Sequence, residues 1–427
     1  MKIKNFHDLA QSKERETALM IAETALQAID TKSVMEKNFV FKNEALFVGG
    51  KYVSLQNIDR IFVVGVGKCS IDAASVVEQV LGDRITDGLV LCIGEQKLTK
   101  MKTYCGTHPF PSLINVEATG EIIKMLRGMT ERDLVLFLIS GGGSTLLCQP
   151  QEMTCENEKD ILQVLFEKGA TIEEINILRK HISLARGGFL AKHAFPAKVI
   201  SLIFSDVPGN NIEFIASGPT VKDSTTISDA KRILEKYGIA DKVVESSLIE
   251  TPKEDKYFKN VWNLIVVSNE IALHSMEEKA RELGFTPVIK TSMLTGEARE
   301  VAKSVLNELE IAPPHTVLLY GGETTVTVEK EGKGGRGLEF VLSACRTIRA
   351  GELVMSVASD GRDNTEFAGA LCDIITKEKA RKFGLDIEQH LEDNLSFKFF
   401  DNVGDYLMTG RTGSNVSDLI ICVKLQF

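Results

Sequence analysis

The sequence predicts an α/β protein of two domains, the first of which contains a mostly parallel sheet. Short apolar segments alternate with segments of helical periodicity along nearly the whole chain. The apolar segments are hydrophobic at consecutive positions, which is typical of strands that are buried on both faces of a parallel sheet. The length of 427 residues exceeds what one ordinary core accommodates, so two or more domains are expected.

The elements of the first domain are expected in the following order. An amphipathic helix near residues 12–29 precedes the first strand. Strands are expected near residues 60–67, 87–94, 133–139 and 198–206. Helices are expected near residues 70–82, 115–128, 156–168, 171–187 and 226–238. Because such sheets bind ligands at the carboxyl ends of their strands, the loops after these strands are the places to search for a site.

A polar, proline-containing segment at residues 250–256 lacks periodicity and predicts the connection between the domains. The first domain is therefore expected to span residues 1–250 and the second residues 257–427. A second alternating series follows the connection, with strands expected near residues 261–268, 286–290, 315–321, 353–359 and 418–425. Two α/β domains that face each other would leave a cleft between them, the usual place for a small-ligand site.

Composition and charge restrict the class of protein. The chain is 44% hydrophobic and 26% charged, as globular proteins are, and its net charge of -9 with no basic tract argues against nucleic-acid binding. No apolar run approaches the ~18 residues that cross a bilayer, and no signal-peptide pattern opens the chain. The eight cysteines form no C-x-x-C pair and no zinc-ligand spacing, which fits reduced thiols. We expect a cytoplasmic protein that binds neither nucleic acid nor membranes.

The first candidate ligand loop follows the strand near residues 60–67. Gly65 and Gly67 precede Lys68, and a helix begins directly afterwards. A glycine turn of this kind presents backbone N–H groups that bind anions, phosphate above all, and Lys68 adds a cation. The sequence therefore predicts a phosphate site here. A solvent-exposed lysine with no function is the alternative.

The spacing of this loop matches neither of two known nucleotide-binding motifs. A Walker A loop requires glycine where Phe62 stands and serine or threonine where Cys69 stands. A dinucleotide-binding fingerprint requires a third glycine where Ser70 stands, although Glu95 at the end of the next strand fits that pattern. An NAD-dependent enzyme therefore stays open as an alternative.

The second candidate loop comprises Ser140, Gly141, Gly142, Gly143 and Ser144, directly after an apolar strand. Three successive glycines lose much conformational entropy on folding and need a reason to be there. A close approach of the backbone to phosphate supplies one, and a tight packing turn is the alternative.

Further charged residues lie beside glycines or at strand ends. Arg179 and Lys180 lie in a predicted helix and could instead form a surface cluster. Asp206 follows a buried strand, where it could serve as a base, as a magnesium ligand or only as a turn residue. The second half of the chain has polar glycine loops at residues 321–325, 332–336, 359–363 and 409–415. Four such loops exceed what turns alone require.

Taken in order, these segments resemble the class II glycerate kinase family, also called the glycerate 2-kinase or MOFRL family. The stretches that carry the resemblance are residues 64–68, 139–144, 178–181, 205–209, 215–220, 321–325, 359–361, 368–370 and 412–415. The resemblance covers nearly the whole chain. It implies a Rossmann-like N-terminal domain, a smaller α/β C-terminal domain and an active site in the cleft between them.

The resemblance implies a kinase that uses ATP and Mg²⁺ to phosphorylate the 2-hydroxyl of D-glycerate. In that family the lysine and arginine that match Lys68 and Arg336 are thought essential. The alternatives are an NAD(P)-dependent hydroxypyruvate reductase, a kinase of a related sugar acid, and a binding protein without catalysis. We allow for a homodimer, since the sequence leaves the oligomeric state open.

The remaining roles are hypotheses that rest on placement at strand and helix ends. The amides of the loop at residues 140–144, with Gly65 and Gly67, would hold nucleotide phosphates, and Asp206 would orient or deprotonate the hydroxyl group. The remaining candidates are Glu323 and Asp360 for the metal and Arg179, Lys180 and Asn415 for the substrate.

The chain departs from the family after Arg336. The family usually continues with Asn-Gln-Glu, whereas this chain has Gly337, Leu338 and Glu339. If the two missing amides line the acceptor pocket, their loss predicts a broader choice of acceptor, because buried polar groups enforce selectivity. The alternative is that these positions face the packing interface of the helix.

Overall fold

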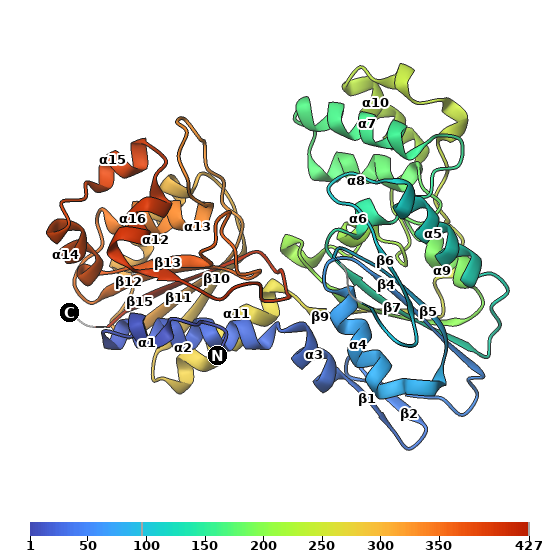
Figure 1. Cartoon of the computed structure of the whole chain (residues 1–427), viewed down its shortest axis with the longest axis horizontal. Helices are drawn as coiled ribbons and strands as arrows, with labels where there is room; N and C mark the ends of the chain where they lie inside the picture. The colour runs from blue at the N-terminus through green and yellow to red at the C-terminus, as the bar shows by residue number, and fades with distance from the viewer. Residues whose placement is uncertain (95–96, 426–427) are drawn as a thin grey trace. The chain divides into compact units, whose positions relative to one another are not determined.

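Three β-sheets organise the fold, which is α/β as the sequence predicts. The structure is a computed structural model and describes residues 1–94 and 97–425 (Figure 1). One sheet has six strands that all run parallel, the second has six strands of mixed direction, and the third has three antiparallel strands. The chain forms two units, which we call the parallel-sheet unit (residues 34–267) and the mixed-sheet unit (residues 1–33 with residues from 268 onward).

The parallel sheet has the strand order β6-β5-β4-β7-β8-β9. In that order the strands are Lys102–Cys105, Ile85–Cys92, Arg60–Val66, Asp133–Ser140, Lys198–Phe204 and Val261–Val267. Within this sheet the central strand β4 comes first in the sequence, and β5 and β6 follow it on one side. The chain then crosses back, and β7, β8 and β9 follow on the other side of β4. Ligands of such sheets bind where the order reverses, at the carboxyl ends of the two central strands. Here those strands are β4 and β7, whose ends are level because Val66 pairs with Ile139.

Helices cover both faces of the parallel sheet. Figure 1 shows α4 (Ser70–Leu81) on one face, with the small sheet of β1–β3 (residues 39–54) packed against it, and α5 (Leu113–Met125) on the other. The helices α7 (Cys155–Glu167), α8 (Ile172–His181) and α10 (Ile227–Lys236) pack around a hydrophobic cluster of their own. The short helices α6 (Gly143–Leu146) and α9 (Phe189–Ala194) follow glycines in the left-handed conformation.

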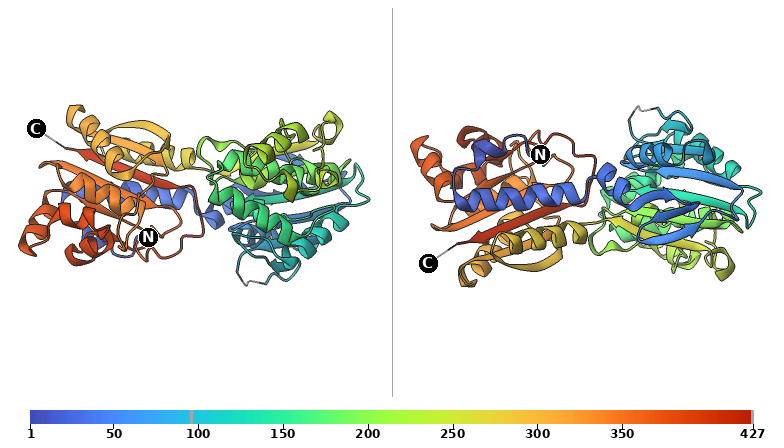
Figure 2. Two further views of the ribbon diagram at one scale, coloured as in Figure 1. Left: turned by 90° about the horizontal axis from the view of Figure 1, so that it is seen from above. Right: turned by 90° about the horizontal axis from the view of Figure 1, so that it is seen from below.

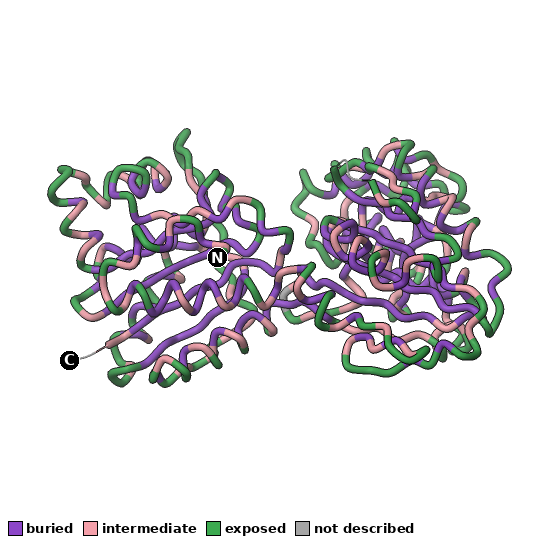
Figure 3. The backbone as a smooth tube through the Cα atoms, turned by 60° about the horizontal axis from the view of Figure 1, so that its bottom comes forward, coloured by how far each residue is buried: buried purple, intermediate pink, exposed green. Residues whose placement is uncertain are grey.

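The mixed sheet has the strand order β10-β11-β15-β12-β13-β14. In that order the strands are Thr286–Leu294, Thr316–Gly322, Asp418–Lys424, Glu352–Ala358, Gly369–Cys372 and Tyr406–Leu407. Among the described strands of this sheet, β10 and β11 pair in parallel and the other neighbours pair antiparallel. Figure 3 shows the central strands in the colour of buried residues, and β11 and β12 are buried at every position.

Two helix layers enclose the mixed sheet. The helices α2 (Lys13–Ala28) and α11 (Asn269–Glu282) pack against each other and run along one face beside β15 (Figure 2). The helices α12 (Ala298–Ile311) and α13 (Arg336–Cys345) cover the other face. The remaining helices of this unit are α1 (Phe6–Leu9), α14 (Ile374–Lys382), α15 (Ile387–Glu392) and α16 (Ser396–Val403), while α3 (Thr31–Asn38) begins where the chain leaves the unit. None of the helices in the described residues is long and apolar enough to cross a bilayer.

The two units differ from the predicted domains at both boundaries. The expected first helix, α2, belongs to the mixed-sheet unit, and the expected first strand of the second domain, β9, pairs with β8 in the parallel sheet. The polar segment at residues 250–256 is therefore internal to the parallel-sheet unit, where Thr251 donates a hydrogen bond to Asp223. The three strands β1–β3 were not predicted, and the expected helix at residues 171–187 ends at His181.

A buried cation explains why α2 belongs to the mixed-sheet unit. The Arg15 side chain is fully buried, and its Nε and Nη2 donate to both carboxylate oxygens of Asp373 at 2.7 Å. Its Nη1 donates to Asp405 at 2.8 Å. Burial acts against the charge, but the bonds to the two carboxylates dominate and raise the Arg15 pKa. This pairing joins α2 to residues that lie more than 350 positions later in the chain.

Replacing this cation should strongly destabilise the mixed-sheet unit. Arg15→Ala would remove the guanidinium from two buried carboxylates, of which Asp405 keeps Lys379 as a cation and Asp373 loses its ion pair, and breaking a buried ion pair typically costs about 3–5 kcal/mol. Thermal unfolding followed by calorimetry should show a markedly lower transition temperature. Lys13→Ala, an exposed position on the same helix, is the matched control and should change little. Equal transition temperatures in the two variants would contradict this account.

Candidate functional site

The two glycine loops predicted from the sequence form one structure at the ends of β4 and β7. Gly67 has a φ of +115°, and a Cβ atom there would lie 2.3 Å from Ser140 Oγ, so only glycine fits. The Lys68 N–H donates to the Gly141 carbonyl at 2.9 Å, and the Cys69 N–H donates to Ser140 Oγ at 3.2 Å. The first loop therefore rests directly on the second, at the point where the strand order reverses.

The second loop offers hydrogen-bond donors that the described part of the chain does not use. The backbone N–H groups of Gly141, Gly142 and Gly143 have no acceptor there, whereas those of Thr145 and Leu146, after Ser144, both donate to the Gly142 carbonyl. Adjacent unpaired amides at the end of a buried strand form a concave site for an anion.

Three basic side chains surround this loop. Lys68 is exposed, and a Cβ atom on Gly142 would lie 3.6 Å from Lys68 Cγ and 3.4 Å from His108 Cδ2. Partial burial, followed by the positive charges of Lys68 and Arg179, lowers the His108 pKa. Burial and the charge of Arg186 lower the Arg179 pKa to about 10, so Arg179 remains a cation at neutral pH. Nothing in the sequence pattern had singled out His108.

Arg179 and Asp206 are both near the loop, at different depths. Arg179 is 5% exposed, its Nη2 lies 3.3 Å from Thr145 Oγ1, and its Nε has no partner among the described residues. Asp206 is less deeply buried and lies beside Gly141, where a Cβ atom would be 1.9 Å from Asp206 Oδ2. The carboxylate thus lies directly against the first glycine of the loop.

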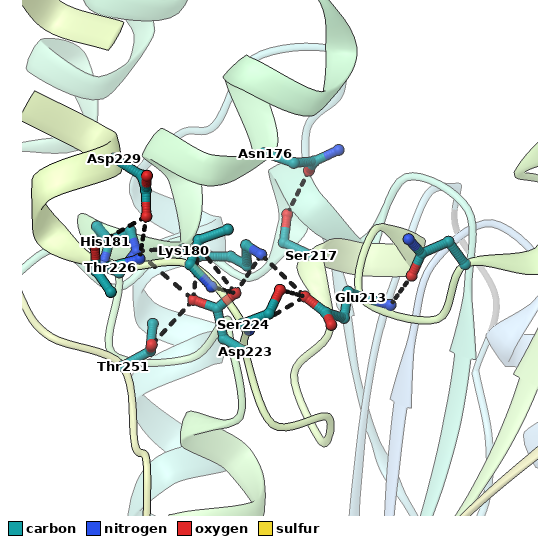
Figure 4. Close-up of polar contacts among 12 residues, drawn as sticks. Asn176, Lys180, His181, Glu213, Ser217, Asp223, Ser224, Thr226, Asp229 and Thr251 are labelled. Atoms are coloured by element: carbon teal, nitrogen blue, oxygen red, sulfur yellow. Dashed lines mark hydrogen bonds and ion pairs between the residues drawn. The ribbon is translucent and has the colours of Figure 1, made fainter. Parts of the chain in front are cut away.

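A strained segment supports the loop from behind. Ala216 and Ser217 have φ values of +51° and +57°, which side-chain-bearing residues rarely adopt. The Ser217 hydroxyl donates to Asn176 Oδ1 at 2.7 Å (Figure 4). Its Oγ also lies 2.9 Å from Ser144 Oγ. A Cβ atom on Gly143 would lie 2.5 Å from the Ala216 methyl group, so the strained backbone fits closely against the glycines.

Two predicted contact residues have structural partners instead. Lys180 is 1% exposed, and its ammonium forms an ion pair with Asp223, which also accepts from Thr251 (Figure 4). Burial acts to raise the Asp223 pKa, but the hydrogen bond and charge of Lys180 lower it overall. Gly65 lies inside β4, where a Cβ atom would be 3.0 Å from Val90. We therefore do not assign Lys180 to the substrate or Gly65 to the phosphates.

The mixed-sheet unit has a second polar cluster at one edge of its sheet. Gly322 of β11 and Ala358 of β12 both pair with Asp418 of β15, so the residues that follow these two strands lie at the same edge as Asp418. Arg336 Nε donates to Asp418 Oδ2 at 2.5 Å, and Arg336 Nη1 donates to Glu323 Oε2 at 3.1 Å. Burial raises the Asp418 pKa to about 7, against the opposing effect of Arg336.

The Asp363 side chain caps the N-terminus of α13. Its carboxylate accepts the N–H groups of Gly337 at 3.2 Å and Leu338 at 2.6 Å. Burial nevertheless raises the Asp363 pKa. These amides are therefore already paired within the protein.

The expectation that Gly337 and Leu338 border an acceptor pocket is wrong. Leu338 is 0% exposed and belongs to the hydrophobic core of the mixed-sheet unit. A Cβ atom on Gly337 would lie 2.7 Å from Ser356 Oγ, so this position also faces the sheet. Neither residue lines the cavity beside Arg336. The helical register turns both positions toward the packing interface, as the alternative interpretation held.

The remaining predicted residues lie in exposed or partly exposed loops. Asp360 is exposed and accepts the N–H of Arg362 at 3.0 Å, and Asn415 Oδ1 accepts the N–H of Ser417 at 3.3 Å. Across residues 1–94 and 97–425, no three His, Cys, Asp or Glu side chains gather in a metal-binding arrangement. Glu95, which fitted the dinucleotide fingerprint, lies outside the described residues.

Comparison with known proteins places these loops in a family. Residues 17–249 match the family described as a domain of unknown function, DUF4147, and residues 316–418 match the MOFRL family. A glycerate 2-kinase of Pyrococcus horikoshii is 37% identical over 96% of this chain and 97% of its own length. A putative hydroxypyruvate reductase of Agrobacterium vitis is 36% identical over 84% of this chain and 86% of its own length.

A solved structure agrees with these matches. The crystal structure of a glycerate kinase from Thermotoga maritima has a TM-score of 0.86, with 33% identity over 96% of this chain and 99% of that chain. The matches extend over both units and include both candidate clusters. The chain belongs to the glycerate kinase family whose members combine a DUF4147 domain with a MOFRL domain.

Proposed function

We propose that this protein is an ATP-dependent glycerate 2-kinase, which transfers a phosphoryl group to the 2-hydroxyl of D-glycerate and forms 2-phosphoglycerate. Family membership supports the reaction class. The observation that carries the proposal is the pair of joined glycine loops, with three unpaired amides and Lys68, at the reversal point of the parallel sheet. This arrangement suits a nucleotide phosphate chain.

Phosphoryl transfer requires positioning and charge stabilisation more than covalent chemistry. We assign the amides of Gly141–Gly143 and the Ser144 hydroxyl to the phosphates of ATP, with Lys68 neutralising charge that develops during transfer. Asp206, against Gly141, would orient the acceptor hydroxyl or accept its proton. Arg179, buried behind the loop, would contribute its positive charge.

The mixed-sheet unit supplies a second cation. Arg336 uses three of its five N–H donors on Asp418 and Glu323, which fixes the guanidinium and leaves two donors for an anion. We assign it to the carboxylate or phosphoryl oxygens of the substrates. Among the described residues Asn415 uses its Oδ1 atom alone, within its own loop, so its NH₂ group is available for a substrate oxygen.

Mg²⁺ belongs to this proposal because kinases use it to neutralise phosphate charge. Its usual protein ligands are one or two carboxylates, and phosphates and water complete the shell. Glu323 and Asp360, which follow β11 and β12, offer this donor type in accessible loops. The chemistry of these donors fits the metal, although Glu323 also pairs with Arg336.

Reduction of hydroxypyruvate with NAD(P)H is the second candidate function, because the relative from Agrobacterium vitis is named a putative hydroxypyruvate reductase. The geometry favours it less. The position of the third fingerprint glycine holds Ser70, whose hydroxyl is buried and donates to the Gly67 carbonyl at 2.8 Å.

The reaction class can be tested directly. ADP should form only when ATP, Mg²⁺ and D-glycerate are present together, and NADH should not be oxidised by hydroxypyruvate. A coupled assay for ADP and direct absorbance of NADH measure the two reactions. Robust NADH oxidation without ADP formation would overturn the kinase assignment. Nucleotide binding with neither activity would indicate a binding protein.

Loss of either assigned cation should strongly impair turnover. Lys68→Ala should lower kcat about a hundredfold or more, as removal of one preorganised charge-stabilising group typically does. Arg336→Lys should also be damaging, because lysine cannot make the forked contact with Asp418. Lys124→Ala and Arg381→Lys are exposed controls in the same units. Near-normal kinetics in folded Lys68 and Arg336 variants would mean that the site lies elsewhere.

The activity should also depend on the ionisation of Asp418. Because the Asp418 pKa is raised to about 7, its ionised form holds Arg336 above pH 7, and this ion pair is lost as the pH falls through 7. The value of kcat/KM should therefore decline on the acid side of about pH 7. Asp418→Asn should have lower activity at pH 8 and should lack this acid limb. Persistence of the same limb in the variant would assign it to another group.

A further inference from the structure

A third loop of the parallel-sheet unit lies against the two glycine loops. It comprises residues 106–112, which connect β6 to α5. A Cβ atom on Gly106 would lie 2.5 Å from Leu146 Cδ2, so the loop approaches α6 closely only because this position is glycine. Since α6 begins at Gly143, inside the loop at residues 140–144, this contact brings residues 106–112 to the proposed phosphate site.

The Asn115 side chain fixes the beginning of this third loop. Asn115 is 0% exposed, and its Oδ1 accepts the N–H of Thr107 at 2.9 Å. Its Nδ2 donates to the carbonyl of Thr107 at 3.0 Å and to the carbonyl of Thr145 at 3.2 Å. One buried amide group therefore joins the residue before His108 both to α5 and to α6.

The Thr145 side chain fixes the loop on the other side of His108. Its hydroxyl donates to the carbonyl of Pro109 at 3.1 Å, and Arg179 Nη2 lies 3.3 Å from the same oxygen. Both sequence neighbours of His108 are thus hydrogen-bonded to buried residues of the unit. The backbone at His108 is therefore held in one place, although the residue itself is exposed.

The His108 ring lies beside the middle glycine of the phosphate loop. A Cβ atom on Gly142 would lie 3.4 Å from His108 Cδ2 and 3.6 Å from Lys68 Cγ, so the ring and the lysine stem meet on one side of this glycine. The ring nitrogen Nε2 is bonded to Cδ2 and lies next to this contact. Within residues 1–94 and 97–425, neither ring nitrogen has a hydrogen-bond partner.

The charges near the ring favour its neutral form. Partial burial, followed by the positive charges of Lys68 and Arg179, lowers the His108 pKa. The acidic group at this loop, Asp206, lies against Gly141 instead. A neutral imidazole still carries one N–H donor. A fixed donor near two cations and beside the unpaired amides suits a phosphoryl oxygen.

We propose that His108 is a further catalytic residue, whose Nε2–H donates a hydrogen bond to an oxygen of the phosphoryl group that is transferred. The inference rests on the proposed function, from which the phosphoryl group is taken. His108 and Lys68 contact this group from the same side of Gly142, and the histidine adds a directed hydrogen bond to the charge of the lysine. Because an adjacent anion favours the protonated ring, phosphate binding raises the His108 pKa.

Two substitutions separate this hydrogen bond from a structural role. Glutamine at this position offers an amide N–H near the place of Nε2, whereas alanine offers no donor. In the coupled ADP assay, His108→Ala should lower kcat about tenfold or more, while the KM for D-glycerate stays within about twofold of the parent value. His108→Gln should restore most of the lost activity.

His274→Ala is the matched control, because His274 is an exposed histidine of α11 in the other unit. It should leave kcat and KM unchanged. Parent-like kcat in His108→Ala, an equal loss in the alanine and glutamine variants, or an equal loss in the His274 control would each overturn the inference.

Nuclear magnetic resonance tests the contact without catalysis. The ring signal of His108 can be assigned by its loss in His108→Gln. Addition of the non-hydrolysable ATP analogue AMP-PNP with Mg²⁺ to the full chain should raise the midpoint of the His108 titration by about one pH unit, as a neighbouring anion does. A purely structural histidine would keep its midpoint.

The outcomes distinguish this inference from the proposed function. Bound AMP-PNP with an unchanged His108 midpoint would overturn the inference and leave the kinase reaction standing. Failure of the parent protein to bind AMP-PNP would refute the nucleotide site, and both proposals with it. A raised midpoint in a protein that forms no ADP would support the phosphate contact and refute the kinase reaction.

Discussion

The contact between Gly67 and Ser140 is the constraint on which the proposed phosphate site depends. Two parallel strands end side by side, and their loops could diverge. They stay together because Gly67 has no side chain and because Ser140 Oγ accepts a hydrogen bond from the N–H of Cys69, two residues after Gly67. The Lys68 N–H is also used, on Gly141. The backbone that carries the lysine and the backbone that offers free amides therefore form one rigid unit.

The rest of the parallel-sheet unit keeps those amides in place. Ala216 and Ser217 hold a backbone conformation that costs free energy, of order 1–3 kcal/mol per residue. The surrounding structure must therefore determine it, and the hydrogen bond from Ser217 to Asn176 does part of this. Asn176 lies on α8, as does Lys180, whose buried ion pair with Asp223 joins the helix to the loops behind it. Lys180 thus supports the site at a distance, which explains why a charged residue is retained in the interior.

The sequence predicted the elements well wherever the signal was local. The strands β4 and β7 lie within one residue of their expected bounds because consecutive apolar residues end abruptly in glycine or serine. The strands β1–β3 had a usable signal that was overlooked: short apolar runs separated by the turn residues Asn43-Glu44 and Gly49-Gly50. The placement of α2 had none, because Arg15 finds its partners at residues 373 and 405.

The candidate site was predictable only where function follows from backbone geometry. Lys68 and the loop at residues 140–144 could be found because glycines at strand ends have few other uses. The contributions of His108 and Ser217 depend on which side chains meet after folding, and no sequence pattern reports that. Gly337 and Leu338 show the reverse error. Their departure from a family pattern suggested a change in specificity, yet Asp363 and Ser356 hold these positions against the sheet. A residue that differs from its relatives affects ligand selection only if it reaches the ligand, and here the helical register directs Arg336 and Glu339 toward the cavity instead.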